Sequence, residues 1–292
     1  MAEGTYKIPT RTSSLRRSII QTNINRVLIY VMFIILAIIA IYPLVWVLTN
    51  SFKTDVQMFD QSWTLPKTWM FENYVTAWKY GVARYIMNSA IVTIGSVTLC
   101  LIVSIMAAYA LARFRFKGST ALLYVILGGL MLAPEVSLIP LFKILSGMGL
   151  YNTYWAMILP NVAFGIPFTT FLIRSYMLGL PKDFEEAATI DGASTLGIFI
   201  HVVIPLCRPI LASAALLDAM RVWNEFMFGL TFITNDKLKT IPVGLMAFGG
   251  ALREQYTVIM AGIIISALPM IILFLATQRQ FIRGLAAGGL RG

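Results

Sequence analysis

The sequence predicts an all-α integral membrane protein with six transmembrane helices and a short cytoplasmic helix between the fourth and the fifth. The 292-residue chain is 58% hydrophobic and 12% charged, with a mean hydropathy of +0.78; this is about half the charge of a typical soluble domain. Six apolar segments are long enough to cross a hydrocarbon core of about 30 Å as helices. The chain has only 13 acidic residues, and a group of them lies between two of these apolar segments.

The six segments follow one another along the chain at the spacing of a multi-pass protein. The first follows an Arg-rich amino terminus, but it is too long for the apolar part of a signal peptide and no small-residue cleavage site follows it. The third and fifth contain charged residues, so their ends are the least sharply defined. The predicted spans are Val27–Leu48, Ile86–Ala112, Ser119–Phe142, Tyr151–Ile173, about Pro205–Ile233 and Tyr256–Thr277.

The basic residues predict the orientation of these spans. Six spans place both termini on one side, and Lys and Arg are more frequent on that side, which favours the cytoplasm. Because these residues flank apolar runs, the net charge of +10 indicates membrane topology and no nucleic-acid partner. We therefore expect a cytoplasmic amino-terminal tail, a six-helix transmembrane domain and a cytoplasmic carboxyl-terminal tail, at 1–26, 27–277 and 278–292.

Two predicted outer segments are large. Residues 50–83, rich in Trp and Tyr, are typical of a folded loop or one that lies at the membrane interface. Residues 234–255 mix charge with Gly and apolar side chains. That mixture suits a loop that dips toward the membrane or meets an outside partner, and it suits a plain connector equally well.

The third span contains Glu135 between Pro134 and Pro140. Each proline removes a backbone donor and tends to kink a helix, and a carboxylate within a membrane is costly. We expect Glu135 to lie in a water-filled vestibule toward the outer end of its helix.

The fifth span contains Asp218, Arg221 and Glu225 at positions i, i+3 and i+7, so they share a helix face. They form either a polar stripe along a pathway or an ion-paired contact with a neighbouring helix. Trp223 and Asn224 favour the pathway slightly, since aromatic faces and amides are groups that sugars usually contact.

Metal and catalytic chemistry have little support. Cys100 and Cys207 are far apart within apolar segments, and His201 is the single histidine. These residues have neither the spacing of a metal site nor that of a catalytic triad, so we predict no metal, no bound cofactor and no catalytic residue.

The acidic stretch "PKDFEEAATIDG" begins and ends like a short helix. Pro181 suits the first helical position, acids favour a helix amino terminus, and Gly192 suits the position that ends a helix. The predicted helix of about ten residues is too short to span. Its shared face comprises Phe184, Ala187, Ala188 and Asp191.

This face predicts a docking surface for another protein. Two adjacent alanines let a partner approach closely, and the acids at the edges offer pairing to basic groups. An amphipathic helix that rests on lipid usually carries Lys and Arg, whereas this one is acid-rich.

At this stretch the sequence resembles a known family. "EAATIDG", nine residues and "VVIP" are similar to the EAA signature of ATP-binding-cassette importer permeases, with Glu186, Ala187, Ala188, Gly192 and Pro205 at its positions. Most of the chain resembles the maltose-type inner subunit of carbohydrate-uptake systems, through "SFKTDVQMF", "FENY", "NSAIV", "WNEF" and the tail "QRQFIRGLAAGGLRG".

The resemblance implies a complex in a bacterial or archaeal cytoplasmic (inner) membrane. Its other parts would be a homologous second permease, an ATPase dimer that binds ATP and Mg, an extracytoplasmic sugar-binding protein and a di- or oligosaccharide substrate. It also implies three contact regions in this chain. They are an ATPase-coupling helix (Phe184, Glu185, Glu186, Ala187, Ala188, Asp191 and Gly192), an ATPase-contacting tail (Arg283, Gly284 and Gly288) and a loop facing the binding protein (Gly244, Phe248, Gly249 and Gly250).

Two alternatives stay open. An ion-gradient-driven secondary transporter would explain Glu135 and the charged stripe of the fifth span, because such carriers use broken helices and buried acids. It would leave the acidic helix unexplained. The same importer machinery could instead carry a polyol or a glycerol phosphate. The chain has no GxxxxGK[ST] phosphate loop, which fits a permease whose ATPase is a separate subunit.

Overall fold

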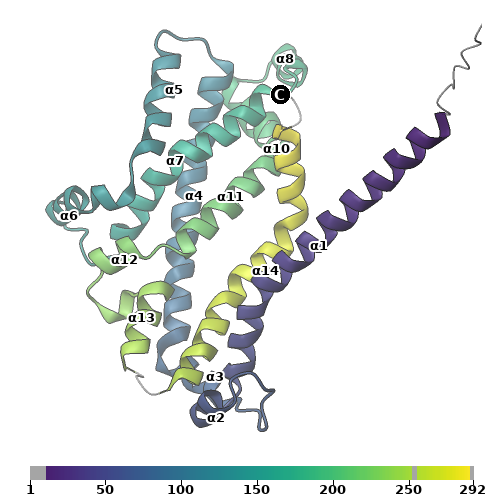
Figure 1. The fold of residues 1–292 in the computed structure, drawn as a ribbon. Helices are drawn as coiled ribbons and strands as arrows, with labels where there is room; N and C mark the ends of the chain where they lie inside the picture. The colour runs from purple at the N-terminus through teal and green to yellow at the C-terminus, as the bar shows by residue number, and fades with distance from the viewer. Residues whose placement is uncertain (1–10, 252–254, 290–292) are drawn as a thin grey trace, which may run out of the picture. The chain divides into compact units, whose positions relative to one another are not determined.

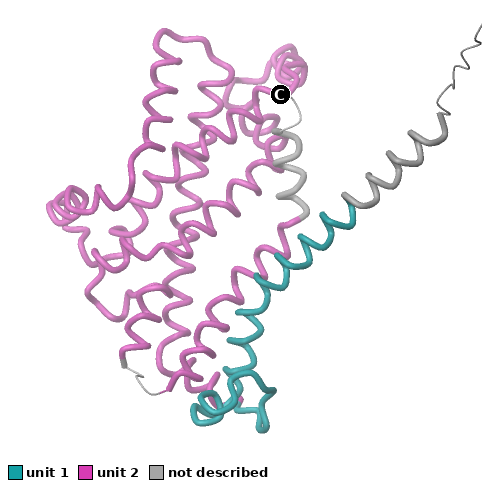
Figure 2. The backbone as a smooth tube through the Cα atoms, in the orientation of Figure 1, with its two compact units in different colours: residues 1–70 teal, residues 71–292 magenta. Residues whose placement is uncertain are grey.

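The computed structural model describes the backbone of residues 11–251 and 255–289, and the side chains of 26–250 and 255–278. Every regular element in these ranges is a helix (Figure 1). The chain divides into two compact units, one ending at Met70 and one beginning at Phe71 (Figure 2). Each unit is described by itself.

The first unit contains one long helix and a folded segment. Helix α1 (Arg11–Ser51) includes an apolar run, Arg26–Ser51, long enough to cross a membrane. After it, α2 (Asp55–Asp60) is capped by Thr54, whose side chain accepts a hydrogen bond from the backbone N–H of Gln57. The segment 50–70 is therefore folded.

A buried lysine organises this segment. The Nζ atom of Lys53 donates to Asn50 Oδ1 at 2.9 Å and to the carbonyl oxygens of Gln61 and Ser62 at 2.8 and 3.1 Å. The side chain is fully buried, and this burial lowers its pKa. Its three N–H groups match three acceptors, which is what a buried ammonium requires.

The second unit holds the remaining elements. Helices α3, η1 and α4 form one kinked run, Glu72–Arg113, in which Gly81 has a φ of 126°. The bounds are α3 (Glu72–Ala77), η1 (Trp78–Val82), α4 (Ala83–Arg113), α5 (Ser119–Gly128), η2 (Gly129–Met131), η3 (Pro134–Ser137), α6 (Leu138–Gly147), α7 (Trp155–Leu178), α8 (Asp183–Ile190), α9 (Thr195–Ile198), η4 (Phe199–Val203), α10 (Ile204–Leu206), α11 (Arg208–Trp223), α12 (Met227–Phe232), η5 (Asp236–Leu238), α13 (Ile241–Ala251) and α14 (Tyr256–Gly289).

The apolar helices confirm the all-α membrane class. In the described residues, four helical runs are long and apolar enough to cross a bilayer: Arg26–Ser51, Glu72–Arg113, Trp155–Leu178 and Tyr256–Gln278. Two bent helix pairs bring the number to six if each pair is one span. The count of six stays a prediction.

The bends correct the predicted third and fifth spans. Ser119–Met131 and Pro134–Gly147 meet at 93°, because Pro134 forces the residue before it out of the helical region; Ala133 has a ψ of 129°. Thr195–Leu206 and Arg208–Trp223 meet at 73°, and α11 ends at Trp223, ten residues before the predicted end at Ile233. The second span also begins earlier than predicted, at Glu72, so the predicted loop 50–83 ends near residue 71.

Helix α4 lies at the centre of the packing. It runs beside α7 and also contacts α11, which in turn packs against α14 (Figure 1). Near the carboxyl end of α4, buried apolar side chains of α4, α7 and α11 form one cluster, including Ile105, Ile173 and Ile210. In a bilayer, such contacts stabilise helix packing through van der Waals interactions.

The predicted outer loop 234–255 contains a helix instead. Helix α13 packs inward: Phe248 is 3% exposed and contacts Ala77 and Val82, and Gly244 lies directly against the ring of Tyr85. The glycines made this segment resemble a loop, but here they allow close helix packing. Gly244 and Phe248, both predicted to face the binding protein, are thus packed within this chain, and their contact with that partner stays a prediction. Gly249 is half-buried, and Gly250 is exposed.

We predict that Gly244→Ala destabilises the protein by about 1–3 kcal/mol, the usual cost of overpacking. The added Cβ would lie 2.4 Å from the Tyr85 ring, which must move. Thermal unfolding in detergent measures the effect. The matched control is Gly250→Ala in the same helix, where nothing lies within 4 Å of the new Cβ. This control should be neutral or slightly stabilising, and equal melting temperatures for the two variants would contradict the packing described.

Candidate functional site

The acidic helix α8 forms as the sequence predicts, with one shift at its start. The carbonyl of Lys182 accepts hydrogen bonds from the N–H groups of Glu185 and Glu186 at 2.9 and 3.0 Å. Lys182 is thus the residue that precedes the helix, and Pro181 lies two positions before the first helical residue, Asp183, instead of at it. The acids of the first turn lie where the helix dipole favours negative charge.

The end of α8 depends on Gly192. Its N–H donates to the Thr189 carbonyl, and the N–H of Ala193 donates to the Ala188 carbonyl, both at 3.0 Å. This pair of bonds is the Schellman motif, which needs a left-handed residue after the helix. Gly192 has a φ of +80°. The next residue but one, Ser194, caps α9 by accepting from the N–H of Gly197 at 3.2 Å.

An ion pair fixes α8 to the end of α4. Arg113 Nε lies 2.7 Å from Glu185 Oε1, and the two side chains are only 7% and 15% exposed. The Nη2 atom of Arg113 also reaches the carbonyl of Leu180 at 3.5 Å. Breaking such a sheltered pair would leave an uncompensated charge, so α8 is held firmly to α4.

This pair changes which face of α8 is open. Glu185 and Ala188 turn toward the chain's own core, although both were predicted to lie on the docking surface. Phe184 remains 56% exposed, and Ile190 is 86% exposed. Ile190 was not predicted as part of the docking surface, because the face chosen from the sequence was centred one residue away from the face that is exposed in the structure.

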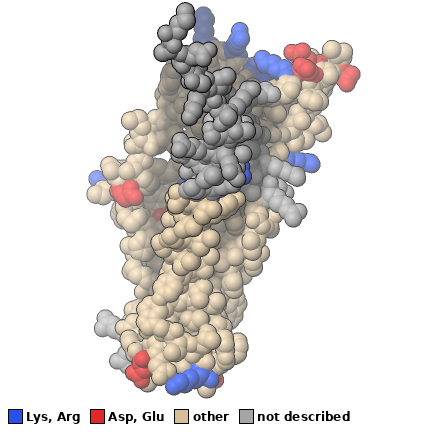
Figure 3. All heavy atoms as spheres, turned by 45° about the vertical axis from the view of Figure 1, so that its right-hand side comes forward, with Lys and Arg blue, Asp and Glu red and all other residues tan. Residues whose placement is uncertain are grey.

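The outer surface of α8 is therefore apolar with acidic edges. Phe184, Ala187 and Ile190 are exposed beside Asp183, Glu186 and Asp191. Figure 3 shows acidic side chains gathered at the end of the second unit where α8 lies. Exposed large apolar side chains with a charged rim are typical of a protein-binding surface.

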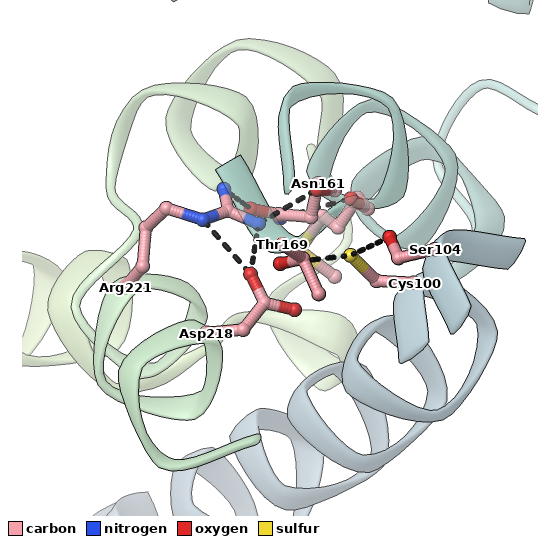
Figure 4. A network of polar contacts seen from close by, with 7 residues as sticks. Cys100, Ser104, Asn161, Thr169, Asp218 and Arg221 are labelled. Atoms are coloured by element: carbon pink, nitrogen blue, oxygen red, sulfur yellow. Dashed lines mark hydrogen bonds and ion pairs between the residues drawn. The ribbon is translucent and has the colours of Figure 1, made fainter. Parts of the chain in front are cut away.

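A second group of functional candidates is a polar network between α7 and α11 (Figure 4). Asp218 is 5% exposed, and its Oδ1 atom accepts from Arg221 Nε at 3.0 Å and Nη2 at 2.6 Å. The same guanidinium donates to Asn161, through Nη1 to Oδ1 at 3.1 Å and through Nη2 to the backbone carbonyl at 2.7 Å. The ion pair thus lies within α11, and hydrogen bonds from its guanidinium to Asn161 join it to the neighbouring helix α7.

Gly165 makes room for this network. A Cβ at this position would lie 2.8 Å from Cys100 Sγ, 2.9 Å from Arg221 Nη2 and 3.0 Å from Asp218 Oδ1. Cys100 in turn contacts the hydroxyl groups of Thr169 and Ser104 at 3.7 and 3.8 Å. The glycine and the cysteine thus help to pack the charged pair.

Beside the network lies a cavity of about 320 Å³. Three of the predicted pathway residues line it: Glu135, Arg221 and Glu225. Glu225 also caps α12, since its two carboxylate oxygens accept from the N–H groups of Phe228 at 2.6 Å and Gly229 at 3.2 Å. The structure thus brings together charges from the third and fifth predicted spans.

Two other pathway candidates lie elsewhere. Trp223 is 8% exposed and packs inside the unit, and the amide of Asn224 donates to the carbonyl of Met220 at 2.8 Å. Neither residue lines the cavity. Asp218 does not line the cavity either, but its carboxylate pairs with Arg221, which does.

Arg283, Gly284 and Gly288, the predicted ATPase-contacting residues of the tail, lie outside the residues whose side chains are described. Among the described residues, no group of three or more His, Cys, Asp or Glu could hold a metal. His201 lies with Nδ1 3.0 Å from the carbonyl of Gly197, within its own helix.

We predict that Arg221→Met destabilises the protein by about 3–5 kcal/mol, because it leaves the buried carboxylate of Asp218 without its cation. The double variant Arg221→Met/Asp218→Leu removes both charges and should recover most of that loss. Thermal unfolding of the two variants in detergent measures the difference. A double variant that is as unstable as the single one would show that the ion pair is not what stabilises this contact.

Comparison with known proteins identifies the family. Residues 100–285 match the family described as the binding-protein-dependent transport system inner membrane component. The chain is 49% identical over 261 residues to the probable ABC transporter permease protein YurM of Bacillus subtilis, covering 89% of this chain and 87% of that one. It is 37% identical to the trehalose/maltose transport system permease protein MalG of Thermococcus litoralis, covering 92% and 98%.

Solved structures share the fold. A chain in the crystal structure of a bacterial ABC transporter involved in the import of the acidic polysaccharide alginate matches with a TM-score of 0.76 and 24% identity, covering 94% of this chain and 100% of that one. A second match, with a TM-score of 0.65, comes from an alginate ABC transporter in complex with an alginate pentasaccharide-bound periplasmic protein. The chain described here belongs to the family of inner membrane components of binding-protein-dependent transport systems.

Proposed function

We propose that this chain is one of two permease subunits of an ATP-binding-cassette importer for a di- or oligosaccharide, and that α8 docks on an ATPase subunit. The observation that carries the proposal is the exposed face of α8, apolar with acidic edges, on a helix tied to α4 by the Arg113–Glu185 pair. Named relatives are permease proteins for trehalose/maltose and for diacetylchitobiose, which supports a sugar as the substrate.

The geometry suggests how ATP would drive transport. When the ATPase subunits bind ATP and close, a partner held on Phe184 and Ile190 would displace α8. Because the Arg113–Glu185 pair is sheltered from water, α4 would move with it. Helix α4 packs along α7 and α11, whose residues build the polar network and the cavity. Movement at α8 would therefore reach the pathway through one continuous helix.

The opposite end of α4 is also anchored. The amide of Asn88 donates to the carbonyls of Lys237 and Lys239 at 2.8 and 2.9 Å, and its oxygen accepts from Tyr154 at 2.7 Å. From Asn88 to Arg113 the helix extends about 38 Å at 1.5 Å per residue. We propose that the segment held by Asn88 faces the sugar-binding protein, so that α4 joins the two partner surfaces.

The remaining parts of the proposal concern topology and assembly. Each bent pair would form one span, giving six, with both termini in the cytoplasm and the chain in a bacterial or archaeal cytoplasmic (inner) membrane. The partners would be a homologous second permease, an ATPase dimer that holds ATP and Mg, and an extracytoplasmic binding protein. The residues Gly244, Phe248, Gly249 and Gly250 of α13, of which Gly250 is exposed, remain proposed contacts of the binding protein. The tail residues Arg283, Gly284 and Gly288 remain proposed contacts of the ATPase.

A secondary transporter is the second candidate function. Two broken helices and the charged groups Glu135, Arg221 and Glu225 around one cavity are features that such carriers use. Uptake by proteoliposomes that contain the complete complex separates the two. The importer requires ATP inside and continues when ionophores collapse the ion gradients. Uptake that stops with the gradients and ignores ATP would support the carrier.

We predict that Glu186→Lys and Gly192→Pro each abolish ATP-driven sugar uptake, although both variants still insert in the membrane. Lysine at 186 reverses an exposed charge on the docking face. Proline at 192 cannot adopt the φ of +80° and removes the N–H that donates to Thr189. Uptake, membrane insertion and copurification of the ATPase would be measured for each variant.

Lys182→Gln, which also changes one exposed charge beside α8, is the matched control and should keep most of the uptake. Wild-type uptake by either test variant would exclude α8 as the coupling helix.

A further inference from the structure

The cavity beside Arg221 lies between a broken helix and a helix end. One side is formed by the bend between α5 and α6, with Leu132 and Glu135, and the other by the turn that follows α11, with Glu225. Broken helices leave backbone groups and side chains available to a polar solute inside a membrane, and such breaks form solute sites in transporters. The volume of about 320 Å³ falls within the usual range for small-molecule sites, roughly 300–1,000 Å³.

The lining offers the groups that a sugar ring uses. Phe164 and Phe228 stack with ring centroids 5.9 Å apart at one wall, which provides an apolar surface for the C–H face of a ring. Four of the five N–H groups of Arg221 donate to Asp218 and Asn161, and the side chain is 37% exposed. The fifth N–H group therefore provides a donor for a sugar hydroxyl. Glu135 and Glu225 provide acceptors for hydroxyl groups.

The charges around the cavity are unequal. Glu135 and Glu225 line it, and the guanidinium of Arg221 is already paired with the buried carboxylate of Asp218. Formal charges thus leave three acids against one base within this group. In the low dielectric of a helix bundle, a further anion in the cavity would be repelled more strongly than in water.

We propose that this cavity is a subsite in this chain for one uncharged sugar ring, and that its acidic lining excludes sugars with a carboxylate, sulfonate or phosphate group. The inference rests on the proposed function for its sugar. It goes further than that function in two ways: it assigns part of the substrate contact to this chain, and it narrows the substrate class from sugars in general to uncharged sugars. The solved transporter that shares this fold is involved in the import of an acidic polysaccharide, so the proposal predicts opposite charge selection within one fold.

The test measures charge and occupancy in the purified complete complex with a single cysteine in the cavity. Leu132→Cys adds a thiol to the lining without changing charge, at a position that is 63% exposed. The native Cys100 and Cys207 are fully buried. The thiol is modified with the cationic trimethylammonium-ethyl or the anionic sulfonatoethyl methanethiosulfonate reagent, and each rate is divided by the rate for a small thiol in solution. Ile139→Cys on α6, 74% exposed and outside the cavity, is the matched control.

At low salt, we expect the normalised cationic rate at Leu132→Cys to exceed the anionic rate at least tenfold. The ratio should fall toward one when Glu135→Gln and Glu225→Gln are added, and it should be small at Ile139→Cys. Trehalose or diacetylchitobiose should slow modification at Leu132→Cys, whereas glucuronate and glucose 6-phosphate should not.

A ratio of one or below, no slowing by either uncharged sugar, or equal slowing by glucuronate would each overturn the proposal. The rate ratio is measured without transport. A failure of ATP-dependent uptake by the wild-type complex would therefore count against the proposed importer function and not against the acidic cavity.

Discussion

The ion pair between Arg113 and Glu185 is the interaction on which the proposed coupling depends. At 2.7 Å and with both side chains sheltered, it joins the short acidic helix α8 to the long central helix α4. A sheltered charge pair contributes little when it is replaced as a unit, yet it costs several kcal/mol to break. It therefore acts chiefly as a constraint: α8 cannot tilt or slide without taking the end of α4 with it.

The same physical rule explains the middle of the bundle. Asp218 and Arg221 are tolerated there because each N–H group in contact has an acceptor and because Gly165 leaves the space that they occupy. Pro134 lies at the break between α5 and α6 and lines the cavity, and Glu225 caps the short helix α12 on the other side. Polar groups inside an apolar bundle are costly unless each has a partner or lines a cavity. Asp218 Oδ1, Arg221, Glu135 and Glu225 meet that condition, whereas the buried Oδ2 atom of Asp218 has no hydrogen-bond partner among the described residues.

Much of this could be predicted from the sequence. Hydropathy indicates the membrane class, and the acids and Gly192 delimit α8 to within a residue or two, because the Schellman motif has a local signal. The shared face of Asp218 and Arg221 follows from helical spacing. The cavity-lining role of Glu135 depends on the bend of 93° between α5 and α6, and that of Glu225 on the end of α11 at Trp223; proline suggests the bend, but hydropathy alone locates neither feature.

Other features depend on partners distant in sequence. Glu185 points inward because Arg113, 72 positions away, is there to meet it, and no local pattern shows this. The sequence predicts a loop at Gly244 and Phe248 because their packing partners, Tyr85 and Ala77, are distant in the chain. Ile190 was missed for the same reason, since the open face of α8 follows from the side that α4 covers.

The most direct measurement is the distance between α8 and α4 during the ATP cycle. Spin labels at Lys182→Cys at the start of α8, outside the docking face, and Ile94→Cys on α4, both exposed positions, would be read by double electron–electron resonance in the complete complex with and without ATP. Stimulated ATPase activity of the labelled sample would show that the cycle proceeds. The account predicts one narrow distance that stays within about 2 Å in both states, since α-helices packed through a buried pair move together, and a broadened one in Glu185→Gln. A shift of several ångströms in the wild-type complex on ATP binding would contradict it.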